Sequence, residues 1–136
     1  MGVPALLAAL STLLVPCGVP GEWPHTRDAA WTVKVLRTAG YGSNGCTGSA
    51  LVVDLGGPGR TGHDLYVWAF TARRLAIEPG MHTVRVTGVR IHVDGLRAVW
   101  RAGRRNVWIE AGPTTRRLPR VARWRALVAA SVVTPG

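Results

Sequence analysis

Short apolar segments, separated by turns rich in glycine, make up most of the chain after residue 28. In Trp31–Arg37 apolar and polar side chains alternate, which predicts a half-buried strand. Leu65–Thr71 is apolar almost throughout, the pattern expected of a strand that is buried on both faces. The same reasoning predicts further strands over residues 47–54, 83–86, 89–93, 96–101 and 106–110.

Turn residues punctuate these segments, with Asp94-Gly95 and Gly103 between the later strands. Several short strands at this spacing predict a mostly β fold, an antiparallel barrel or sandwich. Pro119 suits the first turn of a helix that runs to about Ala130. One face of that helix would be apolar, formed by Leu118, Val121, Trp124, Leu127 and Val128.

The 136 residues suffice for one domain with a hydrophobic core. Residues 1–22 contain an apolar run, 3–15, that is too short to span a bilayer but suits the central region of a secretory signal peptide. A buried N-terminal helix is the alternative. We expect export, with the protein secreted or held in the cell envelope. Residues 23–136 then form a single β-rich domain, with a barrel over 31–112 and a basic helical tail over 113–136.

Motifs for cofactors and metals are weak. Gly40, Gly42 and Gly45 have dinucleotide-motif spacing, but a strand follows them where the phosphate-binding helix should begin. Two cysteines, Cys17 and Cys46, are too few for a four-cysteine zinc site. No histidine pair has helical metal-ligand spacing. We therefore expect no cofactor and no metal. The four histidines are His25, His63, His82 and His92, of which His82 and His92 are more typical of a surface or strand edge.

Charge is unevenly distributed along the chain. The net charge is +10, and residues 1–71 have four basic and four acidic side chains. Residues 72–136 have 13 arginines against three acidic side chains, so all the excess lies there. This asymmetry suggests a polyanionic partner: nucleic acid, an anionic membrane or an acidic domain. The alternative is that 16 arginines against one lysine reflect the coding bias of a GC-rich genome. Interleaved aromatic and basic residues suit the bases and phosphates of single-stranded nucleic acid, but they equally suit a protein interface or a core with a solvated arginine face, which is the favoured interpretation. The predicted polyanion-binding residues are Arg101, Arg104, Arg105, Arg116, Arg117, Arg120, Arg123, Trp124 and Arg125.

Three segments occur in the order found in the N-terminal barrel of trypsin-like serine proteases. They are W31-T-V-K-V, then G45-C46-T47-G48-S49-A50-L51-V52, then Y66-V67-W68-A69-F70-T71-A72-R73-R74-L75. The second resembles the C-G-G-S-L-I segment of that family, and the third its W-V-L-T-A-A-H-C segment. The long loop between them is most similar to the bacterial lysyl-endopeptidase type. The resemblance covers about a third of the chain and implies a Greek-key barrel, half of a chymotrypsin-like fold.

The resemblance also implies that the chemistry is missing. Arg74 stands in place of the catalytic histidine, and arginine stays protonated, so it cannot accept a proton from serine. Leu75 replaces the cysteine that would bridge to Cys46. Asn106 lies near the place of the orienting aspartate, with Asp94 as an alternative, and the G-D-S-G-G nucleophile segment is absent. Ser49 lies inside a predicted strand, where core packing is its expected role.

Two hypotheses of function follow from the sequence. In the first, the chain is a catalytically inactive or truncated homologue of a trypsin-like protease that acts by binding a protein partner. In the second, it is a small module, rich in arginine and tryptophan, that binds nucleic acid or an anionic membrane surface.

Overall fold

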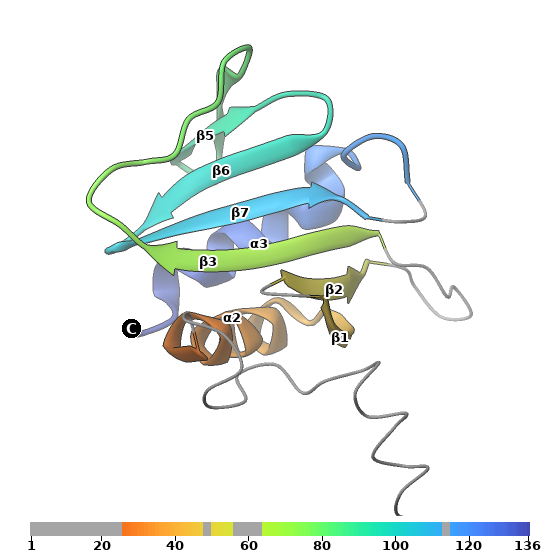
Figure 1. Cartoon of the computed structure of the whole chain (residues 1–136), viewed down its shortest axis with the longest axis vertical. Coiled ribbons are helices and arrows are strands. Elements are labelled where there is room, and N and C mark those ends of the chain that lie inside the picture. The colour runs from red at the N-terminus through yellow and green to blue at the C-terminus, as the bar shows by residue number, and fades with distance from the viewer. Residues whose placement is uncertain (1–25, 48–49, 56–63, 113–114) are drawn as a thin grey trace, which may run out of the picture.

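The computed structural model describes residues 26–47, 50–55, 64–112 and 115–136. Within these ranges, one antiparallel sheet of seven strands is backed by two helices (Figure 1). The prediction of a mostly β fold with a C-terminal helix is thus confirmed. The elements are α2 (Thr26–Ala39), β1 (Gly42–Thr47), β2 (Ala50–Asp54), β3 (Leu65–Thr71), β4 (His82–Val86), β5 (Val89–Val93), β6 (Arg97–Ala102), β7 (Arg105–Ala111) and α3 (Val121–Val133).

The strands lie in the order β1-β2-β3-β7-β6-β5-β4. After β3, residues 72–81 carry the chain to the far edge of the sheet (Figure 1). From there β4 to β7 return as a series of hairpins until β7 pairs with β3. The order begins with β1 and ends with β4. No pairing among the described residues joins these two strands, so closure of the predicted Greek-key barrel is not confirmed.

Helix α2 replaces the strand predicted over Trp31–Arg37, and that prediction was wrong. Buried side chains recur at three- and four-residue intervals, at Asp28, Thr32, Val35 and Leu36, which is a helical period. The alternation at Trp31, Val33 and Val35 came from aromatic and β-branched residues, which favour strands but which the helix accommodates. The buried hydroxyl of Thr32 donates to the carbonyl oxygen of Asp28 one turn earlier, at 2.7 Å.

Both helices pack on the same face of the sheet, where the hydrophobic core lies. Trp31, Val35 and Leu36 of α2 belong to this core together with four residues of α3, Trp124, Leu127, Val128 and Ala130. The indole rings of Trp100 on β6 and Trp124 on α3 stack, with centroids 6.0 Å apart. Trp100 Nε1 also donates to the hydroxyl of Ser131 at 2.8 Å, so the ring pair is satisfied inside the core.

The opposite face of the sheet has no helix among the described elements, and β3 differs there from its prediction. Leu65, Val67 and Ala69 point into the core and are buried. Tyr66, Trp68 and Phe70 alternate with them and are half-buried on the other face. The strand is therefore buried on one face only. We call the face that includes Tyr66, Trp68 and Phe70 the open face.

Most of the other predicted strands and the C-terminal helix are present in the structure. The strand predicted over 47–54 is divided, since β1 ends at Thr47 and β2 begins at Ala50. The predicted C-terminal helix is present as α3. The export segment, Cys17, His25, Ser49 and His63 lie outside the described residues, as does the Cys46 side chain, so their roles stay predictions. None of the described helices is both long and apolar enough to cross a membrane.

Candidate functional site

The nine residues that the sequence predicts for polyanion binding do not form one surface. Trp124 is fully buried in the core, and its indole N–H donates to the carbonyl oxygen of Pro119 at 2.7 Å. It therefore has no surface to offer a ligand, and its prediction as a binding residue was wrong. The interleaving of Trp124 with Arg123 and Arg125 reflects a helix whose apolar side faces the core while its arginines face solvent.

The side chain of Arg105 also makes its contacts within the fold. Its Nε donates to Asp28 Oδ1 at 2.7 Å, and its guanidinium lies 4.7 Å from the centroid of the Trp31 ring. The carboxylate of Asp28, which is buried, accepts from the backbone N–H of Thr71 as well. These contacts tie α2 to the ends of β3 and β7, so the charge of Arg105 is largely neutralised.

The remaining predicted arginines divide between two ends of the sheet. Arg116 and Arg117 precede α3, near the β5–β6 turn, because the N–H of Leu118 donates to the carbonyl oxygen of Gly95. Arg123 lies 3.7 Å from Asp64. Arg101 and Arg104 lie at the other end, at the β6–β7 turn. The members of the first group that are exposed to solvent are Arg116, Arg117, Arg120 and Arg125.

The end of the sheet that includes Arg101 and Arg104 gathers further arginines from distant parts of the sequence. The strands β3, β4 and β6 end there, and β5 and β7 begin there. The topology thus brings residues that follow β3 next to the turns of two hairpins. We call this region the arginine end, and its members are Arg73, Arg74, Arg85, Arg90, Arg101 and Arg104.

Acidic side chains among the described residues lie mainly at the opposite end of the sheet. Asp54 ends β2, Asp64 precedes β3, Asp94 is in the β5–β6 turn and Glu110 is beside Arg97. Glu78 lies in the 72–81 connection, and Asp28 is bonded to Arg105. The described salt bridges involve Arg97, Arg105 and Arg123 and none of the six members of the arginine end, whose charges add to form a positive potential.

Two members of the arginine end lie directly opposite each other. Arg85 on β4 and Arg90 on β5 are cross-strand partners, and both are exposed on the open face. The β5–β6 register pairs Ile91 with Trp100, and one residue further it places Arg90 beside Arg101. Like charges in this arrangement destabilise a sheet. A row of three arginines across neighbouring strands therefore costs stability in the free protein.

Arg74 and Asn106, the two positions that the resemblance assigns to a degenerate catalytic site, are brought together. Asn106 Nδ2 donates to the backbone carbonyl oxygen of Arg74 at 2.9 Å, and its Oδ1 accepts from Arg101 Nη1 at 3.5 Å. Asn106 is fully buried, whereas the Arg74 side chain is exposed. The contact holds the start of the 72–81 connection against the open face and leaves the Arg74 guanidinium in solvent.

At the end of the sheet opposite the arginine end, Asp94 and Arg97 form a salt bridge of 2.9 Å. Burial is the largest single influence on the pKa of Asp94 and acts to raise it. Hydrogen bonds from the N–H groups of Leu96 and Arg97 and from the Arg97 guanidinium act the other way and together lower this pKa below its ordinary value. Asp94 and Arg97 thus neutralise each other, unlike the members of the arginine end.

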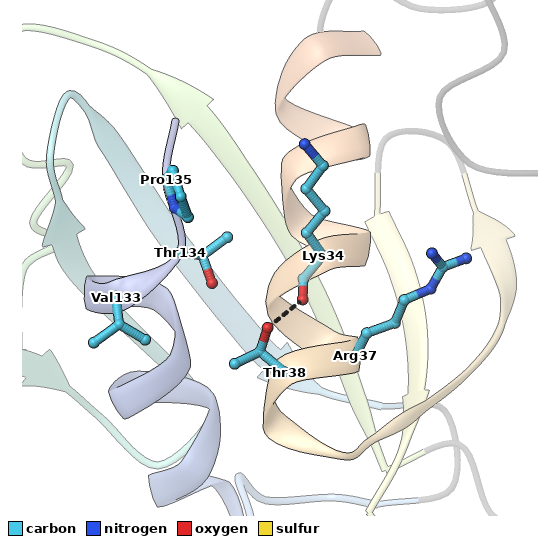
Figure 2. A pocket seen from close by; sticks show the side chains of 6 residues that line it. All are labelled: Lys34, Arg37, Thr38, Val133, Thr134 and Pro135. Atoms are coloured by element: carbon cyan, nitrogen blue, oxygen red, sulfur yellow. Dashed lines mark hydrogen bonds between the residues drawn. The ribbon is translucent and has the colours of Figure 1, made fainter.

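A separate open groove of about 370 Å³ lies between α2 and the residues that end α3 (Figure 2). Lys34 and Arg37 supply its positive charge, and Val133 and Pro135 its apolar wall. Figure 2 shows the Arg37 side chain pointing away from Val133, so the two cations do not converge on one ligand. The groove is on the helical side of the molecule, away from the open face.

The sequence did not indicate that Arg73, Arg85 and Arg90 belong to the arginine end or that the rings of β3 are only half-buried. The sequence did contain a pattern that places Arg85 and Arg90 on one face of the sheet. In the predicted strands 83–86 and 89–93, arginine alternates with valine and isoleucine, so the arginines had to share a face. Their meeting with Arg74 and Arg101 depends on the strand order, which local patterns do not give. Among the described side chains, no three His, Cys, Asp or Glu residues gather in a way that would hold a metal ion.

Comparisons of the chain with protein families, with curated proteins and with solved structures found no match.

Proposed function

We propose that this protein is a binding module whose ligand is a polyanion, held at the arginine end. The observation that carries the proposal is the cross-strand pair of Arg85 and Arg90, extended by Arg101 on the next strand. Folding gains nothing from placing these charges side by side. A ligand with several negative charges would turn their mutual repulsion into attraction.

The surroundings of the row support the same proposal. Arg73, Arg74 and Arg104 lie at the same end of the sheet and are exposed. Arginine is the side chain best suited to phosphate, because its planar guanidinium donates two parallel hydrogen bonds. An anionic membrane bound through α3 is less well supported, because the apolar residues of that helix are buried in the core.

Ancestry from a protease barrel stays a prediction beside this proposal. In that hypothesis too the chain acts by binding, and the two differ in the partner. The buried amide of Asn106 and the solvent-facing guanidinium of Arg74 are consistent with a structural role for the first and a ligand-binding role for the second.

Calorimetric titration of the whole chain with inorganic polyphosphate at 50 and 200 mM salt tests the proposal. We expect affinity to fall steeply with salt, because phosphate contacts release counterions. The double variant Arg90→Gln/Arg104→Gln should weaken binding and flatten the salt dependence. Lys34→Gln/Arg37→Gln removes the same charge from the groove of Figure 2 and is the matched control. Equal losses in both variants, or affinity independent of salt, would refute a site at the arginine end.

A further inference from the structure

The three rings of β3 form a row on the open face. Tyr66, Trp68 and Phe70 are two residues apart, so their side chains lie about 7 Å from one another along the strand. All three are half-buried, while the core residues between them are buried. Three neighbouring aromatic rings on a central strand thus remain partly accessible to solvent, although Trp108 beside them is buried.

The surroundings of the row hold its middle ring in place. Trp108 on β7 stacks against Trp68, with centroids 5.7 Å apart and planes at 30°. The Arg97 guanidinium lies 5.9 Å from the centroid of Trp108, and the Trp108 indole N–H donates to Glu110 at 3.0 Å. Because Arg97 is itself fixed by Asp94, the ring pair is preorganised, which lowers the entropic cost of stacking a ligand on it.

The row leads directly to the arginine end. Phe70 pairs with Asn106 across β3 and β7, and Asn106 pairs with Arg101 across β7 and β6. Two strand spacings, about 10 Å, therefore separate Phe70 from Arg101. The open face thus offers partly exposed rings and, on the far side of the buried Asn106, guanidinium groups that take part in none of the described salt bridges.

We infer that the polyanion is a single-stranded nucleic acid, whose bases stack on Tyr66, Trp68 and Phe70 while its phosphates contact the arginine end. This inference rests on the proposed function and specifies its ligand. A duplex keeps its base faces inside its own stack, so it has no π-face to offer these rings. Polyphosphate and anionic lipid headgroups carry negative charge without flat rings and use the arginine end alone.

The test compares three probes on the whole chain: a 12-nucleotide oligodeoxythymidylate, the duplex it forms with oligodeoxyadenylate, and inorganic polyphosphate. We expect the single strand to bind most tightly and to quench tryptophan fluorescence, which polyphosphate should not do. Phe70→Leu keeps an apolar side chain but removes the ring. It should weaken single-strand binding about 5- to 150-fold, the equivalent of about 1–3 kcal/mol per stacked base, and leave polyphosphate affinity unchanged.

Trp68→Leu should act in the same way, and Leu96→Ala, at an exposed apolar residue of the β5–β6 turn, is the control for loss of apolar surface. Polyphosphate binding as tight as single-strand binding, with Phe70→Leu neutral, would overturn the inference and leave the proposed function standing. Tighter binding of the duplex would also overturn it. Failure of all three probes to bind would refute the proposed function itself.

Discussion

Arg105 on β7 donates to Asp28 on α2 at 2.7 Å while its guanidinium covers the ring of Trp31. The pair joins residues 77 positions apart and is the main polar link between α2 and the sheet. Arg105 is therefore not counted among the members of the arginine end. Arg105, which is engaged within the fold, and Arg104, which is exposed, are thus neighbours in the sequence.

The first prediction concerns this link. Asp28→Asn leaves the mostly buried Arg105 without its charge partner and should lower the free energy of unfolding by about 2–4 kcal/mol. Denaturant unfolding measures the change. Lys34→Gln, at an exposed residue of the same helix, should stay within about 0.5 kcal/mol of the parent protein. If the two variants are equally stable, Asp28 does not anchor α2.

The second prediction separates stability from binding at two aromatic residues. Trp124→Phe removes a buried indole and its bond to Pro119, and should cost about 1–3 kcal/mol of unfolding free energy. Its affinity for oligodeoxythymidylate, measured on folded protein, should be unchanged. Phe70→Leu should show the reverse pattern. A loss of affinity in folded Trp124→Phe would mean that α3 does contribute to the site.

The third prediction is that a substitution of Arg90, in the row with Arg85 and Arg101, raises the stability of the fold and lowers the affinity for polyphosphate. Arg90→Thr relieves the repulsion with Arg85 and places a β-branched residue in the strand, so unfolding free energy should rise by about 0.2–1 kcal/mol. Polyphosphate affinity should fall in the same protein. Thermal unfolding and calorimetric titration measure the two effects. A variant that loses stability as well as affinity would show that the row stabilises the fold.

The fourth prediction is the pH dependence of the Asp94–Arg97 pair. The pKa of Asp94 is lower in the folded protein than its ordinary value of 3.8, so ionised Asp94 stabilises the fold above that pH. This stabilisation is lost as the pH falls through the folded pKa. Asp94→Asn keeps an acceptor for the turn but removes the charge. The stability difference between parent and variant should therefore be constant from pH 7 to 5 and shrink below pH 4, as measured by urea unfolding. A difference unchanged at pH 3 would contradict the assignment.

The fifth prediction concerns the turn between Arg85 and Arg90. Thr87 has a φ of 49° and the following Gly88 a φ of 80°, so both lie in the left-handed region. A β-branched residue is strained there, whereas asparagine tolerates that conformation and favours two-residue hairpin turns. Thr87→Asn should raise the unfolding free energy by about 0.5–1 kcal/mol. A melting temperature below that of the parent would mean that the Thr87 hydroxyl, which donates to Val86, matters more than the strain.

The strands whose apolar pattern is local, either alternating or nearly continuous, were predictable from the sequence. Leu65–Thr71 and Val89–Val93 agree with β3 and β5 at both ends. The segment of α2 was mistaken for a strand because Thr32, Val33 and Val35 favour strands on their own. Its helical period becomes visible only when Asp28 is counted as a buried residue, and Asp28 is buried because Arg105 neutralises it.

The candidate site was less predictable than the fold. The excess of arginine in residues 72–136 indicated a polyanion, but sequence proximity grouped Arg123 and Arg125 with Trp124. In the structure the relevant neighbours come from separate hairpins, as with Arg85 and Arg101. Their meeting follows from the order of strands, a long-range property that no local pattern contains.

The position of β3 has a consequence for the order of folding. Its partners on β7 are 34 to 46 positions away in the sequence, from Thr71 and Arg105 to Leu65 and Ala111. The hairpins from β4 to β7 close short loops at a small cost in chain entropy, so we expect them to form early. The row of aromatic rings on β3 then joins a sheet in which the arginines are already aligned. The two halves of the proposed binding surface thus arise at different times, and only the final pairing step makes it whole.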